Sequence, residues 1–141
     1  MAVDKIKIMF LCTGNSCRSQ MAEGFAQEIG KGFIEAHSAG LNPAGVNERA
    51  VKVMKEIGID ISQQKSKPID EALLKKMDVM ITLCDNAAES CPLTPQGIKR
   101  LHWSLKDPAK AAGTEEEIMR EFRQVRDEIK GKIVNFIGDL Q

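Results

Sequence analysis

The sequence lacks an excess of charge of either sign. Lys and Arg number 20, Asp and Glu also number 20, and the formal net charge is zero. Binding to nucleic acid or to an anionic membrane surface depends on many basic groups acting together. We therefore expect no nucleic-acid partner and no membrane-surface role. Any site for an anion must be built from a few local groups.

Long apolar runs are also missing. No stretch approaches the roughly 18 apolar residues that a membrane-spanning helix needs, so we expect no membrane partner. The opening MAVDKIKIMFLC interleaves Lys with Ile, and no small-residue cleavage site of a secretory signal follows it. These features predict a cytoplasmic protein. The length of 141 residues favours one domain, residues 1–141, and we expect a monomer.

The four cysteines, at positions 12, 17, 84 and 91, lack any C-x-x-C pair. Zinc ribbons and thioredoxin-like motifs use that spacing, so the arrangement argues against a zinc site. In a reducing compartment stable structural disulfides are rare, and free thiols are more often catalytic or metal-binding. The cysteines therefore become candidates for chemistry.

What the sequence does contain is an alternation of two hydrophobic periods, which predicts alternating strands and helices. The expected strands are 6–11, 33–38, 79–83 and 100–103, and the expected helices start near Ser19, span 47–57 and 69–76, and start at Thr114. Ala39 and Gly40 are expected to end the second strand. This pattern predicts an α/β fold whose parallel sheet is covered on both faces. In such sheets ligands bind outside the carboxyl ends of the strands.

A polar turn follows the first predicted strand, within FLCTGNSCRSQMAEG. Backbone N–H groups of such a turn, at a helix N-terminus, form a cradle for a tetrahedral oxyanion. Gly14 permits close backbone approach, and Asn15 tolerates a left-handed conformation. Arg18 offers a planar fork of donors to two anion oxygens. The predicted oxyanion-binding residues are Thr13, Gly14, Asn15, Ser16, Cys17 and Arg18.

Cys12 stands at the start of this turn, where a helix N-terminus and a nearby cation would stabilise the thiolate form. The turn would then bind an oxyanion and present a nucleophile to it. Ser19 could donate a hydrogen bond to that thiolate. From the residues alone, Cys12 could instead be a small buried side chain that ends a strand. Cys17 is interpreted as an ordinary loop thiol or as an oxidation partner of Cys12.

Five segments together resemble a known family: LCTGNSCRSQMAEG, HSAG, MITLCDNAAESCP, HWSLKDPA and FRQVRDEI. They are similar to the thioredoxin-coupled arsenate reductase branch of the low-molecular-weight protein tyrosine phosphatase superfamily, and the likeness covers nearly the whole chain. The resemblance implies a three-layer αβα sandwich. Its four-stranded parallel sheet would have the strand order 2-1-3-4, which makes the first and third strands neighbours.

The resemblance also implies a cysteine relay. Cys12 would attack arsenate, with phosphate and sulfate as competing oxyanions, and Asp107 of an Asp-Pro pair would act as general acid. A Cys12–Cys84 disulfide and then a Cys84–Cys91 disulfide would follow, and reduced thioredoxin would supply the electrons, with no bound cofactor. Three plainer interpretations remain: Asp107 as a turn residue, Cys84 as a buried thiol and Cys91 as a bystander.

Some reductases of this family hold a potassium ion beside the loop. Asn15, Glu23 and Ser38 match the residues that the resemblance implies for it, but Lys67 stands where an acidic ligand would be expected. The ammonium group of this lysine could take the place of the ion. We therefore predict no required metal.

Two other functions remain in competition. A low-molecular-weight tyrosine phosphatase would use Cys12, Arg18 and Asp107 in the same way. The resemblance speaks against it, because those enzymes usually carry an aromatic residue after the Asp-Pro pair, where this chain has Ala109 and no Tyr at all. The other candidate is a non-enzymatic protein whose soft thiolates bind arsenite or zinc.

Overall fold

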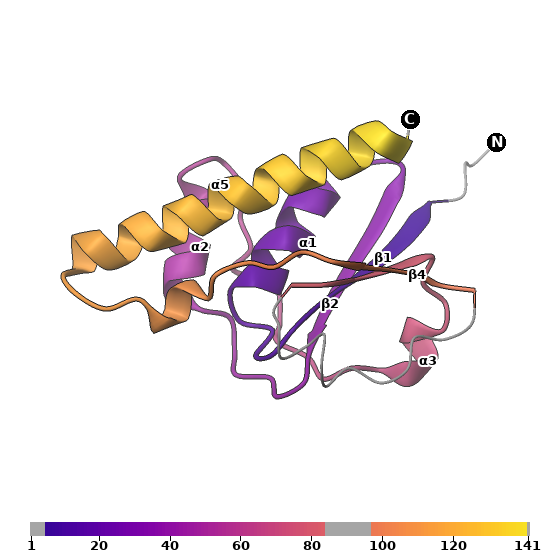
Figure 1. The fold of residues 1–141 in the computed structure, drawn as a ribbon, viewed down its shortest axis with the longest axis horizontal. Helices are drawn as coiled ribbons and strands as arrows, with labels where there is room; N and C mark the ends of the chain where they lie inside the picture. The colour runs from indigo at the N-terminus through magenta and orange to yellow at the C-terminus, as the bar shows by residue number, and fades with distance from the viewer. Residues whose placement is uncertain (1–4, 84–96, 141) are drawn as a thin grey trace.

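A computed structural model of the protein describes residues 5–83 and 97–140. Its sheet runs in the order β2-β1-β3-β4, and every neighbouring pair is parallel (Figure 1). The strands are β1 (Ile6–Cys12), β2 (Ile34–Gly40), β3 (Val79–Thr82) and β4 (Lys99–His102). The predicted strand order 2-1-3-4 is confirmed.

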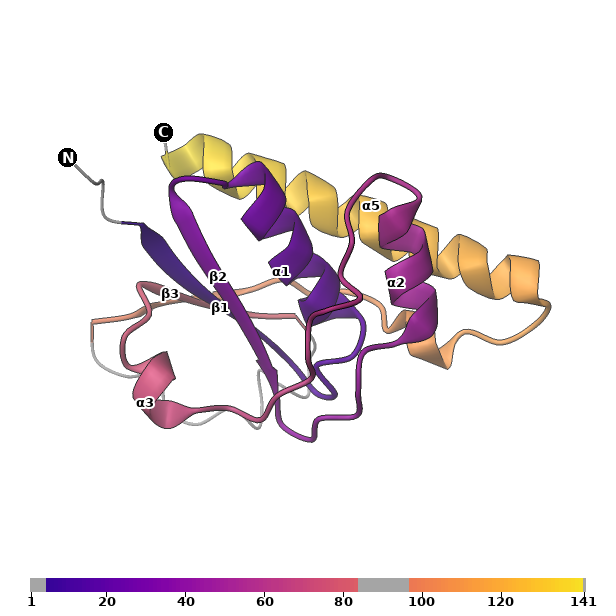
Figure 2. The same ribbon diagram turned by 180° about the vertical axis from the view of Figure 1, so that it is seen from behind.

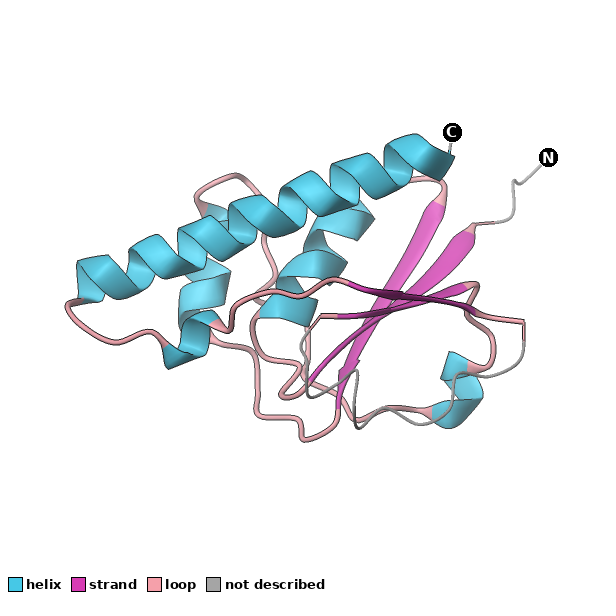
Figure 3. Ribbon diagram, in the orientation of Figure 1, coloured by secondary structure: helices cyan, strands magenta, loops and turns pink. Residues whose placement is uncertain are grey.

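Helices cover both faces of the sheet, as Figures 1 and 2 show from opposite sides. The helices α1 (Arg18–Ile29), α2 (Glu48–Lys55) and α5 (Glu115–Leu140) lie on one face, and the short α3 (Glu71–Leu74) lies on the other. Figure 3 shows the resulting layers by element type. The predicted three-layer α/β architecture is therefore confirmed.

The alternation of side chains along β1 explains the two faces. Ile8 and Phe10 belong to the larger buried cluster, together with Phe25 of α1 and Phe122 of α5. Met9 and Leu11 point the other way and pack with residues that include Leu74 and Met77. Because both faces of β1 are buried, its sequence is apolar without interruption from Ile8 onward.

The helix starts follow from their capping residues. Asn47 accepts hydrogen bonds from the first amides of α2, and Asp70 does so for α3. At the start of α5, Thr114 and Glu117 form the predicted capping box. The Thr114 amide donates to Glu117 at 3.2 Å, and the Glu117 amide donates to the Thr114 hydroxyl at 3.1 Å.

The predicted end of the second strand was wrong. β2 continues through Ala39 and Gly40, which pair with Leu11 and Cys12 of β1. A glycine is needed there, because a Cβ on Gly40 would lie 2.8 Å from the Asn15 amide nitrogen. Gly40 therefore permits close approach of two backbones inside a strand rather than ending it.

Two further features bear on the sequence predictions. Cys84 and Cys91 fall outside the described residues, as does most of the polar loop around them. The stretch after β4, expected to be a loop, contains the short 3-10 helix η1 (Pro108–Lys110). Within residues 5–83 and 97–140, no helix has the length and apolar character that crossing a membrane would require.

Candidate active site

The candidate site lies where β1 ends and α1 begins. We call residues 12–18 the oxyanion loop; β1 ends at Cys12 and α1 begins at Arg18. The residue before the helix, Cys17, makes no side-chain hydrogen bond to the first amides of α1. Those amides thus remain suited to an anionic ligand. The loop occupies the carboxyl edge of the sheet, as predicted.

The carbonyl oxygens of the oxyanion loop are bound from outside by the segment that follows β2. The bonds run from the amides of Leu41 to Cys12 (3.3 Å), Asn42 to Thr13 (2.8 Å), Ala44 to Gly14 (2.9 Å) and Asn47 to Ser16 (3.1 Å). Among the described residues, no backbone carbonyl accepts from the amides of residues 14–17. With the carbonyls held outward, the N–H groups are the backbone groups left for an oxyanion.

Asn15 gives the loop its sharp turn. Its φ of +45° is the one positive value at a non-glycine position in the described chain, and the residue is fully buried. The left-handed region is uncommon for most side chains but several-fold enriched for Asn, so the sequence expectation for this residue is met. The turn brings the Asn15 side chain beneath the loop, against Ser19.

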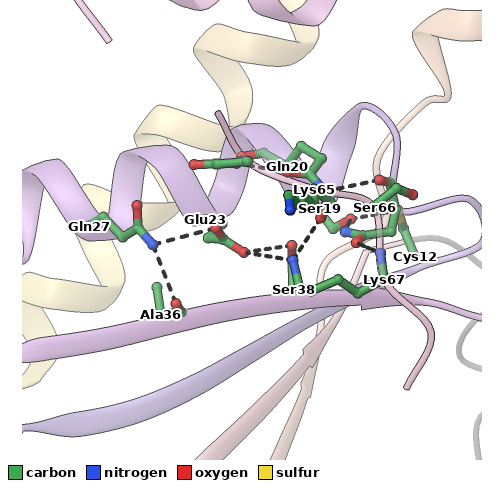
Figure 4. A network of polar contacts seen from close by, with 12 residues as sticks. Cys12, Ser19, Gln20, Glu23, Gln27, Ala36, Ser38, Lys65, Ser66 and Lys67 are labelled. Carbon is green, nitrogen blue, oxygen red and sulfur yellow. Dashed lines mark hydrogen bonds and ion pairs between the residues drawn. The ribbon is translucent and has the colours of Figure 1, made fainter. Parts of the chain in front are cut away.

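Hydrogen bonds beneath the loop fix the direction of one proton (Figure 4). The Lys67 amide can only donate, and it donates to Asn15 Oδ1 at 2.8 Å. Asn15 Nδ2 must therefore donate to Ser19 Oγ, 2.7 Å away. Since Ser19 Oγ already accepts this bond, its own hydrogen is available for Cys12 Sγ at 2.8 Å. Ser19 is therefore oriented to donate this hydrogen to the sulfur of Cys12.

Arg18 supplies the positive charge of the site. Its side chain is only 9% exposed; Nη1 donates to the Leu105 carbonyl at 3.1 Å, and Nη2 lies 3.5 Å from Asp107 Oδ2. Its Nε is buried and has no hydrogen-bond partner among the described groups. An unpaired buried donor costs about 1–3 kcal/mol, so an anion oxygen at this position would be favourable.

Asp107 faces the same space as Cys12. Both line a pocket of about 290 Å³ whose rim includes Asn42, Ala44 and Ala109. Asp107 also caps η1, where its Oδ1 accepts from the Ala109 amide at 3.0 Å. Asp107 therefore caps a turn and also lines the pocket.

Comparison with known proteins identifies the family of this chain. The family model described as low molecular weight phosphotyrosine protein phosphatase matches residues 7–141. The chain belongs to this family.

Three related proteins are especially informative. An arsenate reductase of Halalkalibacterium halodurans is 54% identical over 134 residues, covering 95% of this chain and 96% of that protein. A solved arsenate reductase in the phosphate binding state has a TM-score of 0.80 and 38% identity, covering 96% of this chain and 99% of that one. A thioredoxin-dependent arsenate reductase of Corynebacterium glutamicum has a TM-score of 0.69 and 25% identity, covering 94% of this chain and 64% of that one.

Cys17 is the second cysteine of the oxyanion loop. Burial, the largest cause, together with the nearby Asp107 and Cys12 raises the pKa of Cys17 to about 12, although a hydrogen bond to Ser16 and the charge of Arg18 act in the opposite direction. Cys17 is 4% exposed. It is therefore held as a neutral thiol at physiological pH.

The residues implied for potassium in this family do lie together. Ser38 donates to Glu23 at 2.7 Å, and the Lys67 ammonium lies 3.9 Å from the same Glu23 oxygen. Asn15 Oδ1 is already used by the Lys67 amide. No cluster of three or more His, Cys, Asp or Glu suited to a metal occurs in the described part of the chain. The set fits a metal ion poorly, since an ammonium group already lies against its one carboxylate.

Several residues of the site were missed by the sequence analysis. The sequence assigned no role to the Leu105 carbonyl, to Asn42 and Ala44 of the pocket lining, to the buried Gln20 or to the half-buried Gln64. Gln20 had one usable signal, because it is a polar residue near the start of a helix whose following residues form the apolar stripe. The others meet the loop only through the tertiary fold.

Proposed function

We propose that the chain is an arsenate reductase, which converts arsenate to arsenite by a cysteine relay and is regenerated by reduced thioredoxin. The observation that carries the proposal is the buried Cys12 thiol beneath the anion-binding loop, in a chain 54% identical to an arsenate reductase over 134 residues. The enzyme works as a cytoplasmic monomer, and it needs no bound cofactor or metal.

The first step is substitution at arsenic. Arsenate, like phosphate or sulfate, binds the loop amides and the Arg18 guanidinium. The Cys12 thiolate forms a sulfur–arsenic bond while one arsenic–oxygen bond breaks. Asp107 protonates the departing oxygen, which leaves as water. Arsenic remains in oxidation state V at this stage.

The second step moves electrons. The Cys84 thiolate attacks Cys12 Sγ, so that a Cys12–Cys84 disulfide forms and the sulfur–arsenic electron pair passes to arsenic. Arsenic is reduced to oxidation state III and leaves as arsenite. Cys91 then attacks the Cys84 sulfur, which releases the Cys12 thiolate and leaves a Cys84–Cys91 disulfide. Thioredoxin reduces that bond by the same exchange chemistry.

The sheet supports the first disulfide of the relay. β1 and β3 are parallel neighbours, and Leu11 pairs with Thr82 at their carboxyl ends. The Leu83 amide donates to the Leu11 carbonyl at 2.9 Å. Cys12 follows Leu11 in the sequence, and Cys84 follows Leu83. The described backbone thus brings the two chain segments together up to the residue before each cysteine.

The proposal is tested by thioredoxin-coupled turnover, followed as NADPH oxidation with thioredoxin reductase and arsenate. We expect turnover by the wild type and none by Cys12→Ser, Cys84→Ser or Cys91→Ser. Hydrolysis of p-nitrophenyl phosphate is the internal control. It requires only Cys12 among these three residues, so any such activity should survive in the Cys84 and Cys91 variants. Sustained arsenate reduction by Cys91→Ser would contradict the relay.

A single turnover without reductant locates the product disulfide. After one equivalent of arsenate, peptide mass mapping should find Cys84 linked to Cys91 and Cys12 free. Four free thiols would refute the relay.

The low molecular weight phosphatase activity is the second candidate, favoured by the family match over residues 7–141. Cys12, Arg18 and Asp107 serve phosphate ester hydrolysis equally well. The pocket rim instead carries the small side chains Ala44 and Ala109, which offer no aromatic wall for an aryl ring. A non-enzymatic arsenite- or zinc-binding role predicts tight metal binding and no NADPH oxidation.

A further inference from the structure

Gln20 is a buried polar residue with no role in the steps above. It lies in the first turn of α1, and no part of it reaches solvent. Its Nε2 donates to the carbonyls of Asn15 and Lys65, both at 3.0 Å. Its Oε1 accepts from Gln64 Nε2 at 2.7 Å. Because the two carbonyls can only accept, the orientation of the Gln20 carboxamide is determined.

Gln20 donates to the backbone carbonyl of Asn15, the residue of the oxyanion loop whose φ is positive. Asparagine adopts the left-handed conformation more readily than other non-glycine residues, but the conformation persists only where the surroundings hold it. Asn15 is held at both ends. Gln20 binds its backbone carbonyl, and the Lys67 amide binds its side chain.

Both hydrogen bonds to Asn15, from Gln20 and from the Lys67 amide, affect the direction of the Ser19 hydroxyl hydrogen. The left-handed turn sets where Asn15 Nδ2 meets Ser19 Oγ, and that contact leaves the Ser19 hydrogen for Cys12. We propose that Gln20 is a positioning residue: it holds Asn15 in the conformation that aims the Ser19 hydroxyl at the Cys12 thiolate. Gln20 touches neither the sulfur nor the oxyanion pocket.

The kinetic consequence of this inference rests on the proposed reductase function, but the effect on the Cys12 thiol does not. A purely structural role for Gln20 would lower stability and leave the reactivity of Cys12 unchanged in the folded protein. A positioning role predicts a less reactive Cys12 in a protein that is still folded. Thiol alkylation separates the two, because it needs no arsenate.

The primary variant is Gln20→Met, which keeps the length of the side chain and removes its hydrogen bonds. Alkylation of Cys12 by iodoacetamide near pH 7, measured by mass spectrometry on folded protein, should slow about tenfold, the order expected for one lost hydrogen bond to a charged group. The kcat for arsenate should fall by a similar factor, with a smaller change in KM. Gln27→Met is the control on the same helix: its amide donates to Glu23 Oε2 at 3.4 Å and to the Ala36 carbonyl at 3.5 Å, and neither partner belongs to the oxyanion loop.

A double-mutant cycle shows whether Gln20 acts through Ser19. In a Ser19→Ala background, Gln20→Met should slow alkylation little further. A full tenfold loss in that background, or a wild-type alkylation rate in folded Gln20→Met, would overturn the inference.

A milder variant covers the case in which Gln20→Met does not fold. Gln64→Met changes a half-buried residue and removes the bond to Gln20 Oε1, together with one to the Gln20 backbone carbonyl. It should slow alkylation about threefold, since Gln20 keeps its own donors. An unchanged rate would count against the positioning role. If the wild type fails to reduce arsenate, these alkylation rates still decide the role of Gln20.

Discussion

At the scale of single residues, the hydrogen bonds beneath the oxyanion loop each run in one determined direction. The Lys67 amide, the Asn15 carboxamide and the Ser19 hydroxyl form a chain in which each donor is determined by the one before it. This chain ends on the sulfur of Cys12. By contrast, Cys17, five residues further on, is buried and remains a neutral thiol.

The neutral Cys17 predicts a specific pH dependence of stability. Its folded pKa of about 12 lies above the unfolded value near 9, so between these values the unfolded chain loses a proton that the folded protein keeps. Stability contributed by Cys17 is therefore complete below pH 9 and falls above it, by about 1.4 kcal/mol per pH unit. Urea unfolding of wild type and Cys17→Ala should show a free-energy difference that shifts against the wild type from pH 9 to 10.5. A constant difference would contradict the assigned environment.

The sequence was most informative where a residue type has few conformational or chemical uses. The left-handed Asn15 and the placement of Arg18 beside Cys12 were predicted from residue chemistry next to a strand-turn-helix pattern. Leu105 was not, since it meets Arg18 from a distant part of the chain. Gln20 was not, since its side chain is fixed between the nearby Asn15 and the distant Lys65. Leu105 contributes only a backbone carbonyl, which any residue type could provide.

At the scale of elements, close backbone and helix approaches decide the geometry of the site. α1 packs against the segment after α2 at Gly24, where a Cβ would lie 2.7 Å from Ile61 Cγ2 and 3.3 Å from Met54 Cε. Both neighbours are fully buried. The absence of a side chain at position 24 therefore sets how closely α1, and the loop at its N-terminus, can approach this layer.

Gly24→Ala should destabilise the protein although alanine is the better helix former. Helix propensity favours alanine by about 1 kcal/mol, but overpacking in a filled core costs about 1–3 kcal/mol, so we expect a net loss. Gly131→Ala is the matched control, because Gly131 lies within α5 and a Cβ there meets nothing within 4 Å. That change should stabilise the protein. Chemical denaturation measures both, and a stabilised Gly24→Ala would show that the contact relaxes freely.

The elements themselves were largely predictable because their signals are local. The period of the hydrophobic residues predicted the strands and helices, and the start of the last helix at Thr114 was predicted as well. The end of β2 was missed because Gly40 usually signals a break. Here it lies in a strand so that the backbone of Asn15 can pass close by, a requirement that only the assembled sheet reveals.

At the scale of the whole molecule, the positive and negative charges balance, so the substrate anion is attracted by the groups of the site itself. The formal net charge is zero, so no long-range field steers an anionic substrate toward the loop. Salt should then affect the reaction only through specific competition. Screening of charges by salt would then have little effect on the binding of arsenate.

We expect sodium chloride to change kcat/KM for arsenate by less than about twofold across the physiological range of ionic strength. Sodium phosphate at the same ionic strength should raise the KM for arsenate, because phosphate is a tetrahedral oxyanion that fits the same amides. Steady-state kinetics in the two salts make the comparison. Equal inhibition by both would show that screening, and not occupancy of the loop, controls binding.

The carboxylate of Asp107 pairs with Arg18, the same guanidinium that would bind the substrate anion. The guanidinium lies 3.5 Å from a carboxylate oxygen that comes from a distant part of the chain. When the substrate anion binds, it replaces the Asp107 carboxylate as the partner of Arg18, so the guanidinium exchanges one negatively charged partner for another. The returning carboxylate would help to displace the spent ion at the close of each cycle.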